Sequence, residues 1–251
     1  MRSLKSVGAH LNGAVNHSAN VSAQPGVAAS TLKAPPATTR KPNRLYRFQP
    51  NSCLSQADTH FLLKKQASWQ AQKKDYPAAI RLLDHLIASE PDNAEYYSNR
   101  GLMYYHTQQW KRALADYNQA IAIDPELDSA YNNRANLYAS EQNWTEAIAD
   151  YDQAIDFNPL NIRARLNQAI TFREMGIYPE ALICLEIAIV LNPDAALYAE
   201  RGRVYHLQGD WNCAIADYRT ALRLTQQSQQ KSLSNPSALN RRISNWMNSL
   251  C

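Results

Sequence analysis

The hydrophobic and polar positions of this chain repeat with a period of 34 residues. The segment "ALADYNQAIAIDP" begins at Ala113 and returns as "AIADYDQAIDFNP" from Ala147, with only five differences. Each period holds two stretches with apolar residues at helical spacing. Prolines follow the second stretch at Pro91, Pro125, Pro159 and Pro193. The pattern predicts helix pairs joined by short polar turns, and a period of this length is typical of a solenoid.

Two ladders of small residues predict where the helices of each pair cross. The first ladder is Ala67, Gly101, Ala135, Ala169 and Gly202, and the second is Ala79, Ala113, Ala147, Ala181 and Ala214. The last step of the first ladder is 33 residues, so one residue is missing between Pro193 and Tyr198. Because a larger side chain would push two backbones apart, we expect Gly101 and Ala113 to meet at a helix crossing.

The residue types within each period resemble the tetratricopeptide repeat. Residues 94–127 contain Tyr97, Gly101, Tyr104, Ala113, Tyr117, Ala120 and Pro125, and residues 128–161 contain Tyr131, Ala135, Tyr138, Ala147, Tyr151, Ala154 and Pro159. Residues 195–227 follow the pattern without the proline, and residues 162–194 and 60–93 follow it more weakly. The resemblance implies an all-α, right-handed superhelical solenoid of about five helix-turn-helix units.

The chain divides into three segments. Residues 57–227 form the predicted repeat domain, and residues 228–251 a linker and a C-terminal capping helix. The stripe of that helix is Leu239, Ile243, Trp246, Met247 and Leu250, and a partner-binding or membrane-surface helix is the alternative. Residues 1–56 form a basic segment that we expect to be disordered. A transit peptide is the alternative for this segment, and an electrostatic tether is a third possibility.

The charge of the chain is distributed unevenly. Seven of the 26 basic residues precede Asp58, the first acidic residue, which leaves 19 basic and 22 acidic residues and a net charge of −3 from there on. This balance disfavours nucleic acid as a partner. No apolar run approaches the roughly 20 residues of a membrane helix. We expect a cytoplasmic protein without an integral membrane segment, or a plastid protein if a transit peptide is present.

The sequence contains no catalytic motif. It lacks a P-loop, a GxSxG elbow, an HExxH pair and a dinucleotide fingerprint, and its four cysteines have no zinc-site spacing. We therefore expect no enzyme, no cofactor and no metal site. The predicted function is a scaffold or assembly factor that binds an extended protein segment. A co-chaperone or regulatory subunit is the alternative. The amino-acid sequences of the units resemble repeats that are common in cyanobacteria and plastids, which suggests a role in photosynthetic-complex biogenesis.

The resemblance places a binding groove on the first helices of the units. Asn99, Asn133 and Asn167 form an amide ladder that could pair with a peptide backbone, although they could equally be ordinary solvated residues. The other expected groove residues are Lys64, Ser98, Leu102, Tyr105, Asn132, Asn136, Leu166, Ile170, Arg173, Arg203 and His206.

Two further patterns concern residues beside the predicted groove and the kind of ligand it binds. Arg100, Arg134 and Arg201 form a second ladder, which we interpret as salt bridges within the repeats or stems packed on tyrosines. Some relatives clamp a C-terminal carboxylate with lysine, asparagine and arginine. Here Lys64 and Asn99 match that clamp, but Ser68, Ser129 and Asn133 replace its other members. The missing charges disfavour a carboxylate ligand.

Overall fold

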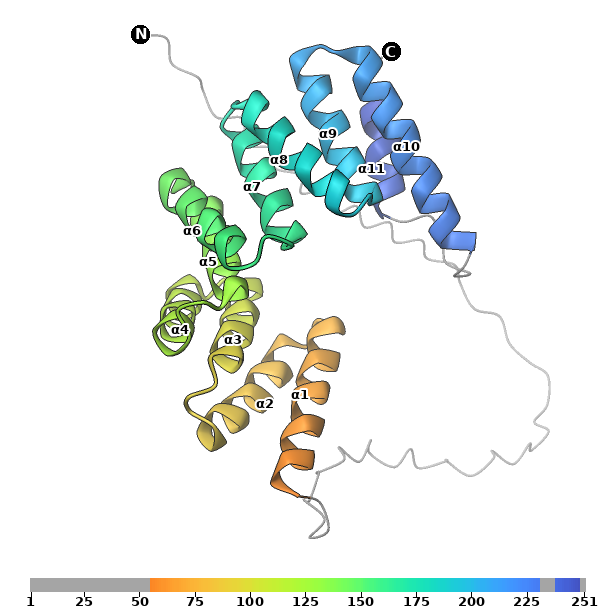
Figure 1. The fold of residues 1–251 in the computed structure, drawn as a ribbon. Coiled ribbons are helices and arrows are strands. Elements are labelled where there is room, and N and C mark those ends of the chain that lie inside the picture. The colour runs from red at the N-terminus through yellow and green to blue at the C-terminus, as the bar shows by residue number, and fades with distance from the viewer. Residues whose placement is uncertain (1–54, 231–237, 249–251) are drawn as a thin grey trace, which may run out of the picture. The chain divides into compact units, whose positions relative to one another are not determined.

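The computed structural model describes residues 55–230 and 238–248, and within these ranges it consists of α-helices and turns. Ten helices form five hairpins (Figure 1): α1 (Gln56–Gln72) with α2 (Tyr76–Ser89), α3 (Ala94–His106) with α4 (Trp110–Ile123), α5 (Asp128–Ser140) with α6 (Trp144–Phe157), α7 (Ile162–Glu174) with α8 (Tyr178–Leu191), and α9 (Ala195–Gln208) with α10 (Trp211–Gln230). A further helix, α11 (Ala238–Asn248), follows. The expected disorder of residues 1–56 falls almost entirely outside the described residues.

Each hairpin packs on the next one along the chain. The second helix of a hairpin contacts the first helix of the following hairpin, as α4 contacts α5 and α6 contacts α7. The first helices also touch one another, in the series α3, α5, α7 and α9. These contacts confirm a solenoid of stacked helix pairs, in which the first helices line one side and the second helices the other.

The turn inside each hairpin repeats one backbone conformation. Its left-handed residue is Lys74, Gln108, Gln142, Gly176 or Gly209, with φ between 60° and 85°. Glycine adopts this conformation without steric cost, whereas lysine and glutamine do so at a cost. The same turn therefore forms in all five hairpins with or without glycine.

The predicted helix crossings are confirmed. The alanines of the second small-residue ladder are 0% exposed, as are Tyr117 and Tyr218. A Cβ atom built on Gly101 would lie 2.7 Å from Cε1 of Tyr117 and 3.2 Å from the carbonyl oxygen of Ala113. Gly202 has the same surroundings in the last hairpin, with Tyr218 at 2.8 Å. Only a small residue fits at these two crossings.

The arginine ladder forms buried salt bridges within the hairpins. Arg100, Arg134 and Arg201 each donate two hydrogen bonds of 2.7–2.8 Å to an aspartate of the following helix, namely Asp116, Asp150 and Asp217. Each guanidinium also lies 5.5–6.0 Å from two tyrosine rings. Both parts of the prediction for this ladder are thus correct.

The fourth hairpin lacks this salt bridge. Gln168 and Cys184 stand where the second, third and fifth hairpins have arginine and aspartate, and they contact each other at 3.4 Å. The amide of Gln168 also donates to Asp152 of α6 at 2.6 Å. Burial raises the pKa of the Cys184 thiol to about 11, so this pair is uncharged at neutral pH.

Helix α11 covers the last hairpin. It contacts α10 and α9, as the first helix of a further unit would. Ile243 is fully buried, and Leu239, Trp246 and Met247 pack on the same cluster. Trp246 stacks on Tyr218 with the ring centroids 5.8 Å apart. Leu250, the remaining member of the predicted stripe, lies outside the described residues.

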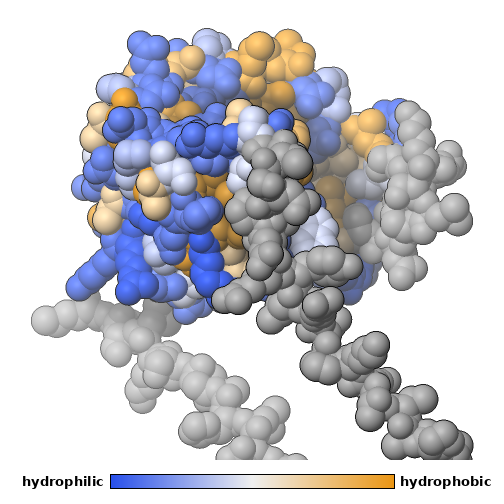
Figure 2. Space-filling model, turned by 90° about the horizontal axis from the view of Figure 1, so that it is seen from below, coloured by the Kyte–Doolittle hydropathy of each residue, from blue (hydrophilic) through white to orange (hydrophobic). Residues whose placement is uncertain are grey.

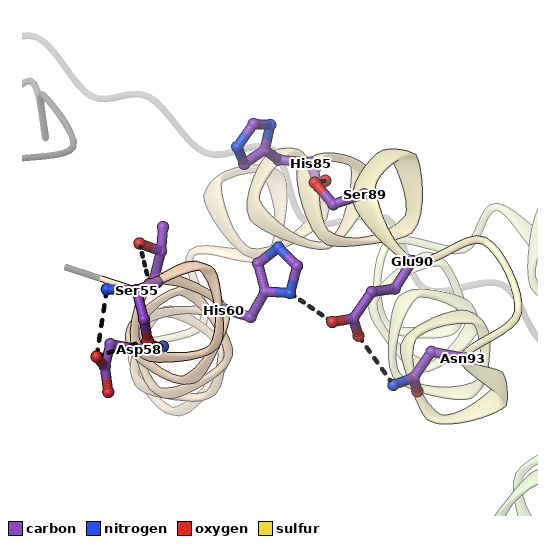
Figure 3. Close-up of polar contacts among 8 residues, drawn as sticks. Ser55, Asp58, His60, His85, Ser89, Glu90 and Asn93 are labelled. Carbon is purple, nitrogen blue, oxygen red and sulfur yellow. Dashed lines mark hydrogen bonds and ion pairs between the residues drawn. The ribbon is translucent and has the colours of Figure 1, made fainter. Parts of the chain in front are cut away.

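Polar side chains join the two helices of the first hairpin to the turn that follows them. Figure 3 shows His60 of α1 pointing toward Glu90, the residue after α2, and Asn93 donating to the same carboxylate. The hydrogen bond from His60 is the main cause that lowers the pKa of Glu90.

Figure 2 shows a largely hydrophilic face on which hydrophobic residues gather in a few places. Across the described residues, each helix is too short or too polar to cross a membrane.

Candidate partner-binding groove

A hollow of about 480 Å³ lies over the N-terminal halves of the first helices. Four of the expected groove residues line it, namely Asn99, Leu102, Asn132 and Asn133. The rest of its wall comes from the start of α5, the start of α7 and the turn between α6 and α7, which includes Asn158 and Leu160. The helical stacking therefore brings amide side chains from α3 and α5 to one surface.

A second hollow of about 400 Å³ continues this surface toward the C-terminal halves of the same helices. It is lined by Leu102, Tyr105, Asn136, Asn167 and Ile170, together with Trp144 of α6. Leu102 belongs to both hollows. The two hollows thus join eight of the expected residues in one surface over α3, α5 and α7, which we call the groove.

The amide ladder links neighbouring helices as well as facing the groove. Asn133 donates to the hydroxyl of Ser98 at 3.2 Å, and Asn167 donates to the amide oxygen of Asn132 at 3.1 Å. Each bond joins a first helix to the first helix before it. Asn133 and Asn167 are consequently half-buried, so the alternative that they are ordinary solvated residues does not hold for either.

Asn99 is the exposed member of the ladder. The place that its amide would reach in the preceding hairpin holds Lys64, which cannot accept a hydrogen bond. Lys64 forms a salt bridge with Glu95 instead. In the part of the chain that the structure describes, the side chain of Asn99 makes no hydrogen bond within the protein, so both the donor and the acceptor of its amide are available to a ligand.

Two of the expected residues face the protein interior. Ser98 is only 2% exposed and is used by Asn133, so the expectation that Ser98 contacts a partner is wrong. Leu166 is half-buried and packs against the hydrophobic cluster of α7 and α8. Their positions follow from the stacking, which turns these two places of the first helix toward the adjacent helix.

The three expected residues nearest the C-terminus lie outside the two hollows. Arg173 pairs with Glu200 and Glu174. Arg203 lies 5.4 Å from the ring of Trp246 in α11. His206 is 5.3 Å from the ring of Trp211, and burial lowers its pKa. These three side chains therefore contact the cap and neighbouring residues of the solenoid.

The groove also contains residues that the sequence did not single out. Asp128 accepts hydrogen bonds from Asn158 at 2.7 Å and Asn161 at 2.8 Å, which fixes the turn beside the first hollow. Trp144 and Glu174 line the second hollow. Trp144 is the first residue of α6, and its contribution to the groove depends on how successive hairpins stack.

Comparisons with known proteins place this chain among repeat proteins. Sequence profiles described as tetratricopeptide repeat match residues 66–137, 129–161 and 166–229. Serine/threonine-protein phosphatase 5 from Homo sapiens is 41% identical over 58 residues, which is 23% of this chain and 12% of the phosphatase. The chain thus matches only a small part of that enzyme.

Solved structures show the same fold. The MamA protein is 19% identical with a TM-score of 0.55, over 72% of this chain and 100% of MamA. A thermophilic TPR protein from Thermus thermophilus is 16% identical with a TM-score of 0.65, over 75% of this chain and 99% of that protein. The three profile matches, the 34-residue period and the five stacked hairpins agree, and the chain belongs to the tetratricopeptide repeat family.

Proposed function

We propose that this protein is a non-enzymatic scaffold or assembly factor that binds an extended segment of another protein in the groove. The observation that carries the proposal is the groove itself, in which the unpartnered amide of Asn99 stands beside the half-buried Leu102. An extended peptide offers backbone donors and acceptors to amides and side chains to apolar surface. The groove supplies both kinds of contact along the first helices of three successive hairpins, α3, α5 and α7.

The charge of the groove supports a protein partner over a nucleic acid. Among the residues that line the two hollows, Arg163 is the one arginine, and it is accompanied by Asp128 and Glu174. Phosphate binding requires clustered positive charge. We therefore propose a polypeptide ligand, whose binding should depend only weakly on salt concentration.

A regulatory subunit or co-chaperone is the second candidate function. The similarity to a segment of a protein phosphatase favours it, because such a segment can act on an enzyme in cis or in trans. The two candidates differ in one measurable result. A regulatory subunit changes the turnover of a bound enzyme, whereas a scaffold binds its partner without changing a rate. A role in photosynthetic-complex biogenesis also stays a proposal, which rests on the amino-acid sequences of the repeats. A plastid location stays a proposal too, which rests on the basic N-terminal segment.

Site-specific photo-crosslinking tests the groove and identifies its partner in the same experiment. A photoreactive amino acid at position 99 should capture a partner protein in cells of the source organism, which mass spectrometry then identifies. The same amino acid at Gln119, an exposed place on the outer helix α4, is the matched control. Capture from position 119 but not from position 99 would refute binding in the groove.

Asn99→Ala is expected to weaken the affinity for the captured partner about two- to twelvefold. One neutral hydrogen bond contributes about 0.5–1.5 kcal/mol, which corresponds to this range. Calorimetric titration with the purified partner measures the effect. Because Asn99 is exposed and alanine is the better helix former, the thermal midpoint should not fall. Gln119→Ala should leave the affinity unchanged, and equal affinities for the wild type and Asn99→Ala would count against the proposed contact.

A further inference from the structure

The outer face of α8 carries a stripe of exposed aliphatic side chains. Ile183, Ile187 and Val190 are 56%, 41% and 83% exposed, and Leu191 at the end of the helix is 40% exposed. Residues spaced by four and three positions lie on one side of a helix, so these side chains form a continuous stripe, which we call the α8 stripe. The opposite side of α8 packs into the hydrophobic core of its own hairpin.

The neighbouring second helices have no such stripe. At the places of Ile183, Ile187 and Val190, α6 has Ala149, Gln153 and Asp156, and α10 has Ala216, Thr220 and Arg223. The place of Leu191 is apolar in all three helices, with Phe157 in α6 and Leu224 in α10. Stacking of the repeats makes the same demands on all three helices. Ile183, Ile187 and Val190 therefore serve something other than the stability of the solenoid.

Charges of opposite sign flank the α8 stripe. The outer face of α6 exposes Glu146, Asp152 and Asp156, whereas that of α10 exposes Arg219 and Arg223. Because α7 contacts both α6 and α8, and α9 contacts both α8 and α10, the three faces follow one another in this order. α8 itself exposes Glu180 and Glu186 beside the stripe. The outer surface thus runs from acidic on α6, through the α8 stripe with these two glutamates at its margins, to basic on α10.

We propose that this surface binds a second copy of the chain, with the two α8 helices parallel to each other. A two-fold axis along α8 brings the two stripes together and places the acidic α6 of one copy opposite the basic α10 of the other. Asp156 and Arg223 stand at the same place in their helices as Val190, so they face each other at the same height. A two-fold axis perpendicular to α8 would instead place the acidic α6 of one copy opposite α6 of the other, and the basic α10 opposite α10.

The size of the surface fits a specific dimer. A helix of 14 residues such as α8 is about 21 Å long and about 10 Å wide, so three helix faces offer about 600 Å² per copy. The total of about 1,200 Å² is at the lower end of specific interfaces. The basic N-terminal segment fits less well, because its charges would meet Arg219 and Arg223. The groove lies on the first helices, so a dimer would present two grooves.

Polar replacement of the stripe tests its role. Ile187→Gln together with Val190→Gln gives α8 a polar outer face like that of α6, and the side chains involved are exposed, so the fold should be unaffected. Sedimentation velocity of the full chain over a range of concentrations should show a wild-type dimer whose dissociation constant rises about a hundredfold in the variant. Ala115→Gln together with Ala122→Gln on the exposed face of α4 is the control and should dimerise like the wild type.

Charge exchange tests the parallel arrangement. Asp156→Arg and Arg223→Asp should each weaken the dimer about tenfold, since each change turns two attractive contacts per dimer into repulsive ones. An equal mixture of the two variants should form a heterodimer of wild-type affinity. One chain that carries both changes should recover the homodimer. A wild type that stays monomeric, a stripe variant that dimerises normally, or single charge variants without effect would each overturn the proposal.

Discussion

Replacing Arg134 by glutamine is expected to lower the free energy of unfolding by about 3 kcal/mol. Arg134 donates to Asp150 from Nε at 2.7 Å and from Nη2 at 2.8 Å, and Asp150 is only 6% exposed. The hydrogen bonds that Arg134 donates to this carboxylate raise the pKa of Arg134, so its guanidinium stays charged. Glutamine would leave the buried carboxylate without a cation. The midpoint of thermal unfolding, followed by circular dichroism, should fall by about 6–12 °C.

The fourth hairpin supplies the matched control for this prediction. There the chain has removed both charges at once, with Gln168 and Cys184 at the places of Arg134 and Asp150. Arg134→Gln combined with Asp150→Cys should therefore recover at least about 1 kcal/mol relative to the single variant. Arg163→Gln, at an exposed place on α7, should stay within about 0.5 kcal/mol of the wild type. Equal losses in the single and double variants would show that the buried charge is not the cause.

Much of the architecture followed from the 34-residue period. Positions that repeat at a fixed step must have the same surroundings in every unit, so the small residues marked the crossings and the prolines marked the ends of the second helices. The arginine ladder was interpreted correctly for the same reason, because a charge that recurs beside tyrosines needs a recurring partner. The weak unit 60–93 still forms the hairpin of α1 and α2, since its Ala67 and Ala79 are buried like their counterparts.

The contacts between units were harder to predict. Asn133 bonds to Ser98 and Asn167 bonds to Asn132, each across 35 residues rather than 34. Equivalent residues of neighbouring units are 34 positions apart. Comparing them does not show that each asparagine reaches the residue just before its equivalent in the preceding unit. The sequence therefore indicated which residues form the ladder, but not that two of its three members join neighbouring helices.

The α8 stripe shows a second limit of sequence patterns. The run "ALICLEIAIVL" from Ala181 is apolar on nearly every side of the helix, so the period of its hydrophobic residues does not distinguish the buried side from the exposed one. Only the stacking of α8 against α7 and α9 decides that Ile183 and Val190 face outward. The same holds for Arg203, which the pattern placed in the groove and which α11 covers.

The crossing at Gly101 differs from the equivalent crossing at Ala135. Tyr151 packs beside Ala135 and donates its hydroxyl to Asn136 at 2.7 Å. In the preceding hairpin Leu102 stands at the place of Asn136, and the hydroxyl of Tyr117 is buried without a hydrogen-bond partner within the described structure. Burial accordingly raises the pKa of Tyr117. The ring of Tyr117 lies against Gly101, where the ring of Tyr151 leaves room for a methyl group.

Gly101→Leu is therefore expected to lower the free energy of unfolding by about 1–3 kcal/mol through overpacking. The new Cβ would lie 2.7 Å from the ring of Tyr117 and 3.2 Å from the carbonyl oxygen of Ala113, and the backbone atom cannot yield as a side chain can. Gly101→Ala introduces the same Cβ contacts but no further carbons, and the gain in helix propensity of about 1 kcal/mol offsets part of their cost, so its loss of stability should be smaller than that of the leucine variant. Asn99→Leu, on the exposed side of the same helix, controls for added apolar surface. Urea unfolding should give the order wild type, alanine variant, leucine variant, and equal midpoints for Gly101→Leu and the wild type would mean that α3 and α4 do not cross at this residue.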